Sequence, residues 1–284
     1  MNKIGVLINY TKDTNFREKV LDAKSLGIEC CQLCFWDTSL YTDENAKIIR
    51  EVAESESFEV AALWGGWSGP CVWNFEEGPT TIGLVPPEYR EGRLIELFRA
   101  SEFAEKIGVD KVITHVGFLP SDPTDEGYIG TVEAIRRLSA VVSARGQKFL
   151  FETGQEPPEV LKRAIDDIGT EAVGVNLDTA NLILYGMSST LDAVEIIGKH
   201  VLCTHIKDGV YPTGDGRLGK EVRAGDGEAN IPEVLRRLAA IGYRGPLVIE
   251  REISGAEQRR DIERTVGLLR EILKNIYNQN SCEV

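Results

Sequence analysis

Four polar residues stand at the ends of short apolar segments, and their types are those of a metal site. They are Glu152 in FLFETG, Asp178 in GVNLDT, His205 in LCTHIK and Glu250 in LVIERE. A single such residue is usually an ordinary hydrogen-bonded group, but three buried carboxylates grouped without a cation would be costly. Three carboxylates and one imidazole suit Mn, Mg or Co better than a structural zinc, with Zn a further candidate. The pattern predicts one divalent metal ion, provided that the four segments are neighbouring strands.

The segments that must position these residues are short β-branched or apolar runs, which alternate with amphipathic helical stretches along the chain of 284 residues. Several helical stretches end in Gly, as tight helix-to-strand turns do: Gly27, Gly108, Gly146, Gly169 and Gly242. Eight strands are predicted, at residues 3–10, 28–35, 58–65, 111–117, 148–154, 172–179, 201–208 and 246–252.

Eight strand–helix units in a chain of this length predict an α/β fold, a single-domain (β/α)8 TIM barrel over residues 1–284. An open doubly wound sheet is the alternative, but the units number eight and no linker or change of composition divides the chain. Two long connections, at about 67–88 and 209–230, each follow a strand, which places them on the C-terminal face, where barrels carry their sites. Because neighbouring strands lie about 4.8 Å apart, the four candidate ligands would line one arc of that rim.

The motifs around these residues resemble those of the sugar isomerase/epimerase family of xylose-isomerase-like TIM barrels, and within it the ketose 3-epimerases. The resemblance extends over nearly the whole chain and rests on FETGQE (151–156), LDTAN (177–181), THIKD (204–208), RAGDGE (223–228) and VIERE (248–252). It implies the metal ligands named above, of which Glu152 and Glu250 would also be the acid/base pair.

The resemblance also implies two substrate-binding residues, Arg223, which matches a substrate-binding arginine, and Asn181, which stands where the family often has His. His115, at the end of the fourth strand, is a further candidate to orient a sugar hydroxyl or the bases. Lys207 shares the inward parity of His205 and could bind a hydroxyl or a phosphate. Trp67 belongs to a group of aromatic residues near strand ends that would give a sugar an apolar wall. The competing interpretations of these last three are a hydrogen-bonded rim histidine, a lysine paired with a carboxylate, and aromatic core packing.

The residues predict a divalent-metal-dependent sugar epimerase or isomerase that acts through an enediolate on a ketose or a related keto sugar. A cation bound to the sugar carbonyl and a neighbouring hydroxyl would acidify the adjacent carbon and stabilise the enediolate. Two carboxylates on opposite sides could then remove a proton from one face and return it to the other. The same residues also suit a dehydratase acting on a sugar or an inosose. Outside catalysis, they suit a sugar-binding regulatory barrel.

Composition argues against a nucleic-acid partner. Lys and Arg number 32 against 45 Asp and Glu, for a formal net charge of −13, whereas nucleic-acid binding depends on cationic side chains. The same superfamily includes zinc nucleases that act on abasic DNA and resemble one another in a multi-histidine site for three zincs. This chain has three histidines in total, which is too few for such a site.

The expected location is the cytoplasm, without a membrane partner, because the N-terminus does not look like a signal peptide and no apolar run approaches a membrane span. The grouped cysteines Cys30, Cys31 and Cys34 are expected to be small buried residues rather than zinc ligands, since alternation turns Cys31 away from the other two. The glycines of 214–219 match a dinucleotide-binding pattern but lack the strand–turn–helix context, and a loop over the site is expected there. The long amphipathic segment 254–280 predicts an outer helix, which would suit a homodimer or tetramer.

Overall fold

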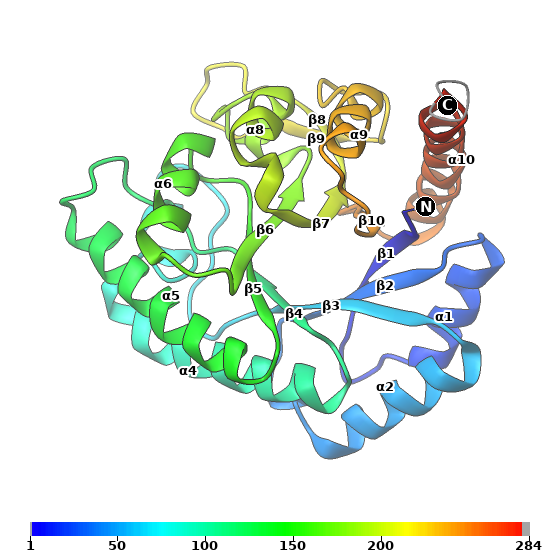
Figure 1. The fold of residues 1–284 in the computed structure, drawn as a ribbon, viewed down its shortest axis with the longest axis horizontal. Helices are drawn as coiled ribbons and strands as arrows, with labels where there is room; N and C mark the ends of the chain where they lie inside the picture. Colours follow the sequence, from blue (N-terminus) through cyan, green and yellow to red (C-terminus); the bar gives the residue numbers. More distant parts are fainter. Residues whose placement is uncertain (1, 280–284) are drawn as a thin grey trace.

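The structure is a computed structural model that describes residues 2–279, and these form a closed barrel of eight parallel strands with helices around it (Figure 1). The order around the barrel is β1-β10-β7-β6-β5-β4-β3-β2, which confirms the predicted (β/α)8 TIM barrel. The barrel strands are β1 Ile4–Asn9, β2 Cys30–Phe35, β3 Glu59–Gly65, β4 Lys111–Thr114, β5 Lys148–Glu152, β6 Val173–Asp178, β7 Val201–Ile206 and β10 Leu247–Ile249.

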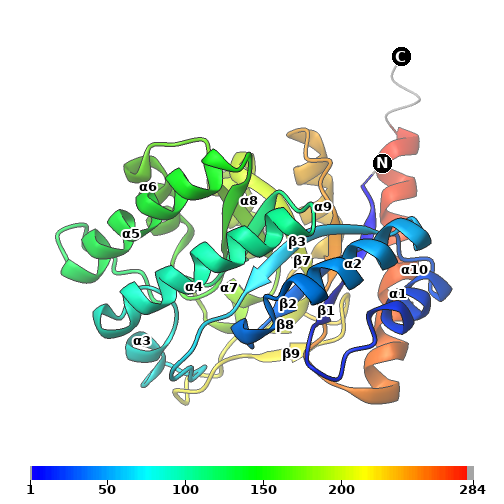
Figure 2. The same ribbon diagram turned by 90° about the horizontal axis from the view of Figure 1, so that it is seen from below.

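The helices lie outside the barrel, except for short ones in the loops. They are α1 Phe16–Ser25, α2 Asp43–Glu56, α3 Gly78–Thr81, α4 Pro87–Lys106, α5 Glu126–Ala144, α6 Pro158–Ile168, α7 Asn181–Leu184, α8 Thr190–Ile197, α9 Ile231–Ala240 and α10 Gly255–Gln279, with 3-10 turns at Thr38–Leu40 and Gly198–His200. Two long connections, 66–86 after β3 and 207–230 after β7, carry α3 and an antiparallel hairpin, β8 Asp208–Val210 with β9 Lys220–Val222. Figure 2 shows α3 and this hairpin at the same end of the barrel, opposite the end of α10.

Strand periodicity places the side chains of the barrel interior. One cluster of inward-facing residues fills the inside of the barrel, among them Cys34, Trp64, Ile113, Leu150 and Cys203. The residues of opposite parity pack against the helices in the larger core cluster. Because barrel strands are covered on both sides, most strand positions are buried and apolar, and a polar residue there stands out.

The structure shortens several predicted strands at the rim. The fourth was predicted over 111–117 and ends at Thr114, and the last was predicted over 246–252 and ends at Ile249. Glu250 therefore follows its strand, although its N–H still donates to the Ile206 carbonyl. At this edge of the barrel the chain leaves the hydrogen-bonded ladder and continues as loops.

Turns and caps follow local sequence chemistry. All five glycines predicted at helix ends adopt a positive φ, between 68° and 90°, a backbone conformation that costs glycine little and other residues more. Side chains cap the N-termini of several helices by accepting a backbone N–H, as Thr42 does for α2, Asp125 for α5 and Ser189 for α8.

Three smaller predictions are also confirmed. Cys30, Cys31 and Cys34 are buried free thiols, and Cys34 lies in the interior cluster while Cys31 lies in the outer one. The glycines of 214–219 lie in the turn between β8 and β9 and lead into a strand rather than a helix. The C-terminal segment forms α10, which buries one face of apolar residues. None of the helices in residues 2–279 combines the length and apolar character needed to cross a membrane.

Candidate metal and substrate site

The four candidate ligands converge at the C-terminal rim of the barrel. Glu152 ends β5, Asp178 ends β6, His205 lies next to the end of β7, and Glu250 follows β10. Strand register places Asp178 beside His205. Glu152 pairs with Asn176, two residues before Asp178, and His205 pairs with Val248, two residues before Glu250. One ligand atom from each lies within 4.8 Å of the others. Within residues 2–279, no other group of metal-ligating side chains comes together in this way.

The Asp178 carboxylate shows that the cluster suits a cation. Its Oδ1 accepts the N–H groups of Ala180 and Asn181, whereas Oδ2 is buried and accepts no hydrogen bond. The nearest cationic atoms to Oδ2 are His205 Nδ1 at 3.8 Å and Lys207 Nζ at 3.9 Å. Burial raises the pKa of Asp178 well above its ordinary value, against the lowering effect of Lys207. A divalent ion in the cluster would satisfy this oxygen and stabilise the carboxylate.

Gln32 orients the imidazole of His205. This glutamine is fully buried on β2, and its Oε1 lies 2.7 Å from His205 Nε2. Its amide nitrogen donates in turn to Asn176 Oδ1 at 3.2 Å. Because an amide oxygen only accepts, Nε2 carries a proton and donates it, which turns Nδ1 toward the carboxylates. Burial opposes a charged imidazole, but Glu152 and Glu250 hold the pKa of His205 well above its ordinary value. A metal ion bound at Nδ1 would take the place of the proton there.

Glu152 is held by three aromatic or imidazole groups. The indole N–H of Trp64 donates to its Oε2. Its Oε1 lies 2.9 Å from His205 Nδ1 and 3.6 Å from His115 Nε2. Burial raises the pKa of Glu152, but His115 and His205 outweigh burial and lower it. The carboxylate is therefore ionised and fixed, with one oxygen tied to Trp64.

Lys207 supports Glu250 on the other side of the cluster. Glu250 Oε2 lies 3.2 Å from His205 Nδ1 and 3.4 Å from Lys207 Nζ. Lys207 is almost fully buried, and its ammonium also lies 2.8 Å from Glu252 Oε1 and 3.3 Å from Asn181 Oδ1. Burial opposes ionisation of Glu250, yet Lys207 and His205 hold its pKa well below the ordinary value. Lys207 is therefore paired with carboxylates, which is the second of the two interpretations of this residue.

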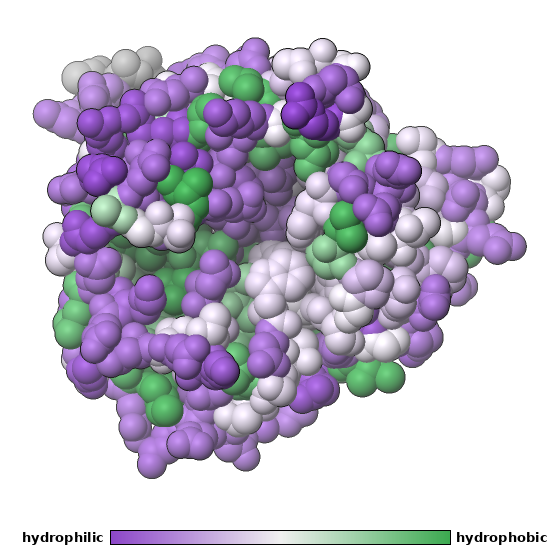
Figure 3. Space-filling view, turned by 180° about the vertical axis from the view of Figure 1, so that it is seen from behind, coloured by the Kyte–Doolittle hydropathy of each residue, from purple (hydrophilic) through white to green (hydrophobic). Residues whose placement is uncertain are grey.

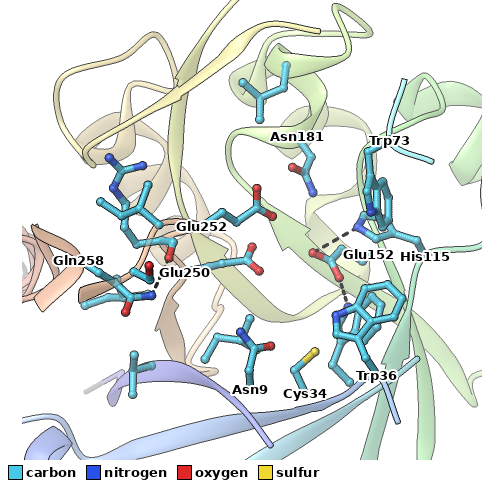
Figure 4. Close-up of a pocket in the computed structure, with 18 of the residues that line it drawn as sticks. Asn9, Cys34, Trp36, Trp73, His115, Glu152, Asn181, Glu250, Glu252 and Gln258 are labelled. Atoms are coloured by element: carbon cyan, nitrogen blue, oxygen red, sulfur yellow. Dashed lines mark hydrogen bonds and ion pairs between the residues drawn. The ribbon is translucent and has the colours of Figure 1, made fainter. Parts of the chain in front are cut away.

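The cluster borders a pocket of about 640 Å³ on the C-terminal face, which Glu152 and Glu250 line. Figure 3 shows this face, hollowed near its centre with hydrophilic residues at depth. Trp36, Trp73 and His115 form an aromatic wall, with ring centroids 6.3 Å apart for the two tryptophans and 5.2 Å apart for Trp73 and His115. This wall faces Glu250 and Glu252 across the pocket (Figure 4).

Three predicted substrate-binding residues are not part of the pocket lining. Lys207 is buried in its ion pairs. Arg223 stands at the end of the β8–β9 hairpin, where its guanidinium pairs with Asp226 at 2.7 Å. Trp67 is buried and packs against Trp36, at 5.4 Å between ring centroids. His115 and Asn181 do line the pocket.

Sequence reasoning missed three residues of the site: Gln32, Trp73 and Glu252. Gln32 is a polar residue inside an apolar strand with the inward parity of Cys34, and that signal could have identified it. Glu252 has the same parity as Glu250, two residues away. Trp73 lies in a loop without periodicity, so nothing in the sequence indicates that it reaches the pocket.

Comparisons with known proteins agree with this geometry. A model of the family described as Xylose isomerase-like TIM barrel matches residues 20–272. The crystal structure of a xylose isomerase domain protein from Planctomyces limnophilus is similar with a TM-score of 0.90 and 30% identity, covering 98% of this chain and 99% of that one. The structure of L-ribulose 3-epimerase gives a TM-score of 0.76 over 99% of this chain and 98% of that one, and at 14% identity shows likeness of fold.

One curated protein that is similar in sequence is an epimerase. The 2-epi-5-epi-valiolone 7-phosphate 2-epimerase of Actinoplanes sp. is 29% identical over 174 residues, which are 59% of this chain and 61% of that protein. The chain spans 61% and 63% of the length of the curated relatives that it matches.

Proposed function

The chain belongs to the xylose isomerase-like TIM barrel family, and we propose that it is a divalent-metal-dependent sugar epimerase or isomerase acting on a ketose or related keto sugar. The observation that carries this proposal is the convergence of four candidate ligands beside one pocket, which Glu152 and Glu250 both line. The epimerase among its relatives supports the same class of reaction.

Glu152, Asp178, His205 and Glu250 would hold one divalent cation, with Mn, Mg and Co the first candidates and Zn a further one. When bound, such a cation supplies a Lewis acid that polarises a sugar carbonyl and stabilises the negative charge of an enediolate. Oδ2 of Asp178, which is buried without a hydrogen-bond partner, is the donor atom that most needs this ion.

Glu152 and Glu250 are the proposed acid/base pair. They stand on β5 and after β10, with β6 and β7 between those strands in the barrel, so their carboxylates enter the pocket from two sides. One carboxylate would remove the proton from the carbon beside the carbonyl, and the other, after taking up a proton from solvent, would deliver it to the opposite face. The outcome is inversion of that carbon, with one C–H bond broken and one formed.

The remaining polar residues would orient the sugar. Asn181 and His115 offer an amide and an imidazole to hydroxyl groups, and His115 Nδ1 is buried without a hydrogen-bond partner. Lys207 would hold Glu250 in its ionised form. The hairpin loop contributes Leu218 to the lining, which places an apolar side chain where it can exclude water from the reacting carbon.

Hydrogen exchange with solvent tests the proposal. The chain, loaded with Mn²⁺ or treated with EDTA, is incubated in D2O with ketoses, aldoses, inososes and their phosphates, and deuterium incorporation is followed by NMR. Metal-dependent exchange at the carbon beside a carbonyl is the expected result. The product distinguishes an epimer from an isomer or an enone formed by dehydration. Metal-dependent sugar binding without exchange at any carbon would contradict catalysis and indicate a binding protein.

A further inference from the structure

We propose that the pocket selects an uncharged sugar and rejects sugar phosphates and sugar acids, with Glu252 as the residue that determines this specificity. The inference rests on the proposed function and concerns the substrate class of the same site. Two observations support it: the cationic side chains near the pocket are already paired with carboxylates, and the Glu252 carboxylate is exposed to the pocket.

The pocket lining carries negative charge beyond that of the proposed metal ligands. Glu252 lines it together with Glu152 and Glu250, whose charges the cation would offset, whereas Arg251 is the only arginine or lysine among the lining residues that the structure describes. The Arg251 guanidinium lies between two further acids, 2.9 Å from Glu221 Oε1 and 2.9 Å from Asp261 Oδ2. An arginine held between two carboxylates offers little net attraction to a phosphate.

Lys207, the other cation near the pocket, is neutralised in the same way. Its ammonium lies 2.8 Å from Glu252, 3.4 Å from Glu250 and 3.9 Å from Asp178. The Glu252 side chain is 59% exposed, so its charge faces the space a substrate would enter. A substrate phosphate would have to displace or approach this carboxylate, at a cost from like-charge repulsion.

The backbone N–H groups of the loop 223–229 already have an acceptor within the protein. TIM barrels often bind phosphate through N–H groups of the loops that follow their last two strands. Here the buried carboxylate of Asp208 accepts the N–H groups of Gly225, Gly227 and Ala229, at 2.9 to 3.0 Å. The protein therefore fills this anion-binding concavity with its own carboxylate. Arg223, at the start of the loop, pairs with Asp226 outside the pocket.

The opposite wall favours an uncharged ligand. Trp36 and Trp73 remain 42% and 39% exposed while they line the pocket. Indole faces pack well against the C–H groups of a sugar and offer nothing to an anion. Carboxylates on one side and indoles on the other suit a neutral polyol, whose hydroxyl groups donate to the acids.

Matched pairs of sugars test the inference. The Mg²⁺-loaded chain is titrated with D-fructose and D-fructose 6-phosphate, and with D-xylulose and its 5-phosphate, at constant free Mg²⁺. The four tryptophans of the chain all lie at or directly behind the pocket, so their fluorescence reports binding independently of turnover. Hydrogen exchange in D2O is followed on the same pairs. The neutral member is expected to bind at least about tenfold more tightly than its phosphate.

Two charge-removing variants separate the local effect of Glu252 from net charge. In Glu252→Gln, Lys207 loses its closest carboxylate, and the preference for the neutral sugar is expected to fall by about fivefold or more. Glu263→Gln removes the same charge from the exposed outer side of α10 and should leave the preference within about twofold of wild type. An unchanged preference in Glu252→Gln would overturn the role of this residue.

The failure of the inference differs from the failure of the proposed function. Tighter binding or faster exchange of the phosphates overturns the inference and leaves the epimerase or isomerase function standing. Binding of neutral sugars without exchange of any sugar overturns the function and supports the charge preference. A panel that neither changes the fluorescence nor exchanges contradicts both.

Discussion

His205 presents Nδ1 to the carboxylates of the candidate metal site because its Nε2–H is held by Gln32 Oε1, at 2.7 Å, from across the barrel. The two residues are 173 positions apart in the chain, and both are fully buried. The tautomer and ring orientation of a candidate metal ligand thus depend on a glutamine in a strand that contributes no ligand itself.

Replacing Gln32 should therefore weaken metal binding. Gln32→Met keeps the side-chain length but removes the acceptor, and we expect the affinity for Mn²⁺ to fall by about 10- to 100-fold. Competition with a metal-binding dye measures this. Gln147→Met is the matched control, since Gln147 is also buried and hydrogen-bonded, to Ser101 and Val109, far from the site. An equal loss of metal affinity in both variants would mean that general destabilisation, not His205 orientation, is responsible.

Metal removal should lower thermal stability. A metal ion at 100 times its dissociation constant stabilises the folded state by about 2.7 kcal/mol, which corresponds to a melting temperature about 5 °C or more higher for a chain of this size. The expected result is a melting temperature that falls in EDTA and returns with Mn²⁺. Asp178→Asn, which keeps the Oδ1 acceptor for Ala180 and Asn181, should show no metal-dependent shift. A full shift in this variant would place the ion elsewhere.

The two proposed bases should each be required for epimerisation, and the one that faces the C–H bond also for hydrogen exchange. Glu152→Gln and Glu250→Gln keep the shape of the side chain and remove its proton-accepting charge, and each should slow epimerisation by about 10²- to 10⁴-fold. NMR in D2O measures the rate, and metal content is determined in the same samples. Rapid exchange retained by both variants with metal bound would contradict the two-base mechanism.

Arg93 should act as a positioning residue for the aromatic wall. This buried arginine donates to the carbonyls of Ser68, Pro70, Thr81 and Gly83, and so ties together the loop that carries Trp73. Arg93→Lys keeps the charge but loses the planar fork of donors, and should lower stability by about 1–3 kcal/mol.

The kinetic effect of Arg93→Lys distinguishes positioning from simple destabilisation. Below the melting temperature of the variant, KM should rise by about fivefold while kcat changes less, because the displaced wall contacts the sugar and not the reacting carbon. A red shift of the tryptophan fluorescence should accompany it. Arg236→Lys, on the exposed side of α9, is the control. Unchanged KM and fluorescence would contradict the positioning role.

Cys71 should be unreactive until high pH. Burial raises the pKa of its thiol to about 11, against the lowering effect of Arg93. The neutral thiol therefore persists in the folded protein above the pH at which an unfolded cysteine ionises, and stability is lost as pH rises from about 9 toward 11. Cys282, which lies outside the described residues, is replaced by Ser so that it does not contribute to the signal. In this variant, alkylation of Cys71 by iodoacetamide at pH 8 should be about a hundredfold slower than that of an ordinary thiol. Rapid alkylation at pH 8 that is absent in Cys71→Ser would refute this.

The barrel and the four candidate ligands follow from the sequence because both depend on periodicity. A strand alternates its side chains with a period of two, so the parity of Glu152, Asp178, His205 and Glu250 already determines that they face inward. Their positions at the carboxyl ends of successive strands place them at one rim. These relations hold without knowledge of any loop.

The loops and the buried polar contacts were decided only by tertiary structure. Trp73 reaches the pocket and Arg223 does not, because their loops are shaped by Arg93 and Asp208, whose hydrogen bonds join residues distant in sequence. Gln32 finds His205 only when the barrel closes.

Charge shows most clearly what the sequence determines and what depends on the tertiary structure. The net charge of −13 is a property of the sequence, but whether Arg251 or Lys207 is available to a ligand depends on which carboxylates pack beside it. Coulomb interactions fall off with distance and are strengthened by burial, so the selectivity of the pocket is determined by pairs that only the folded chain creates.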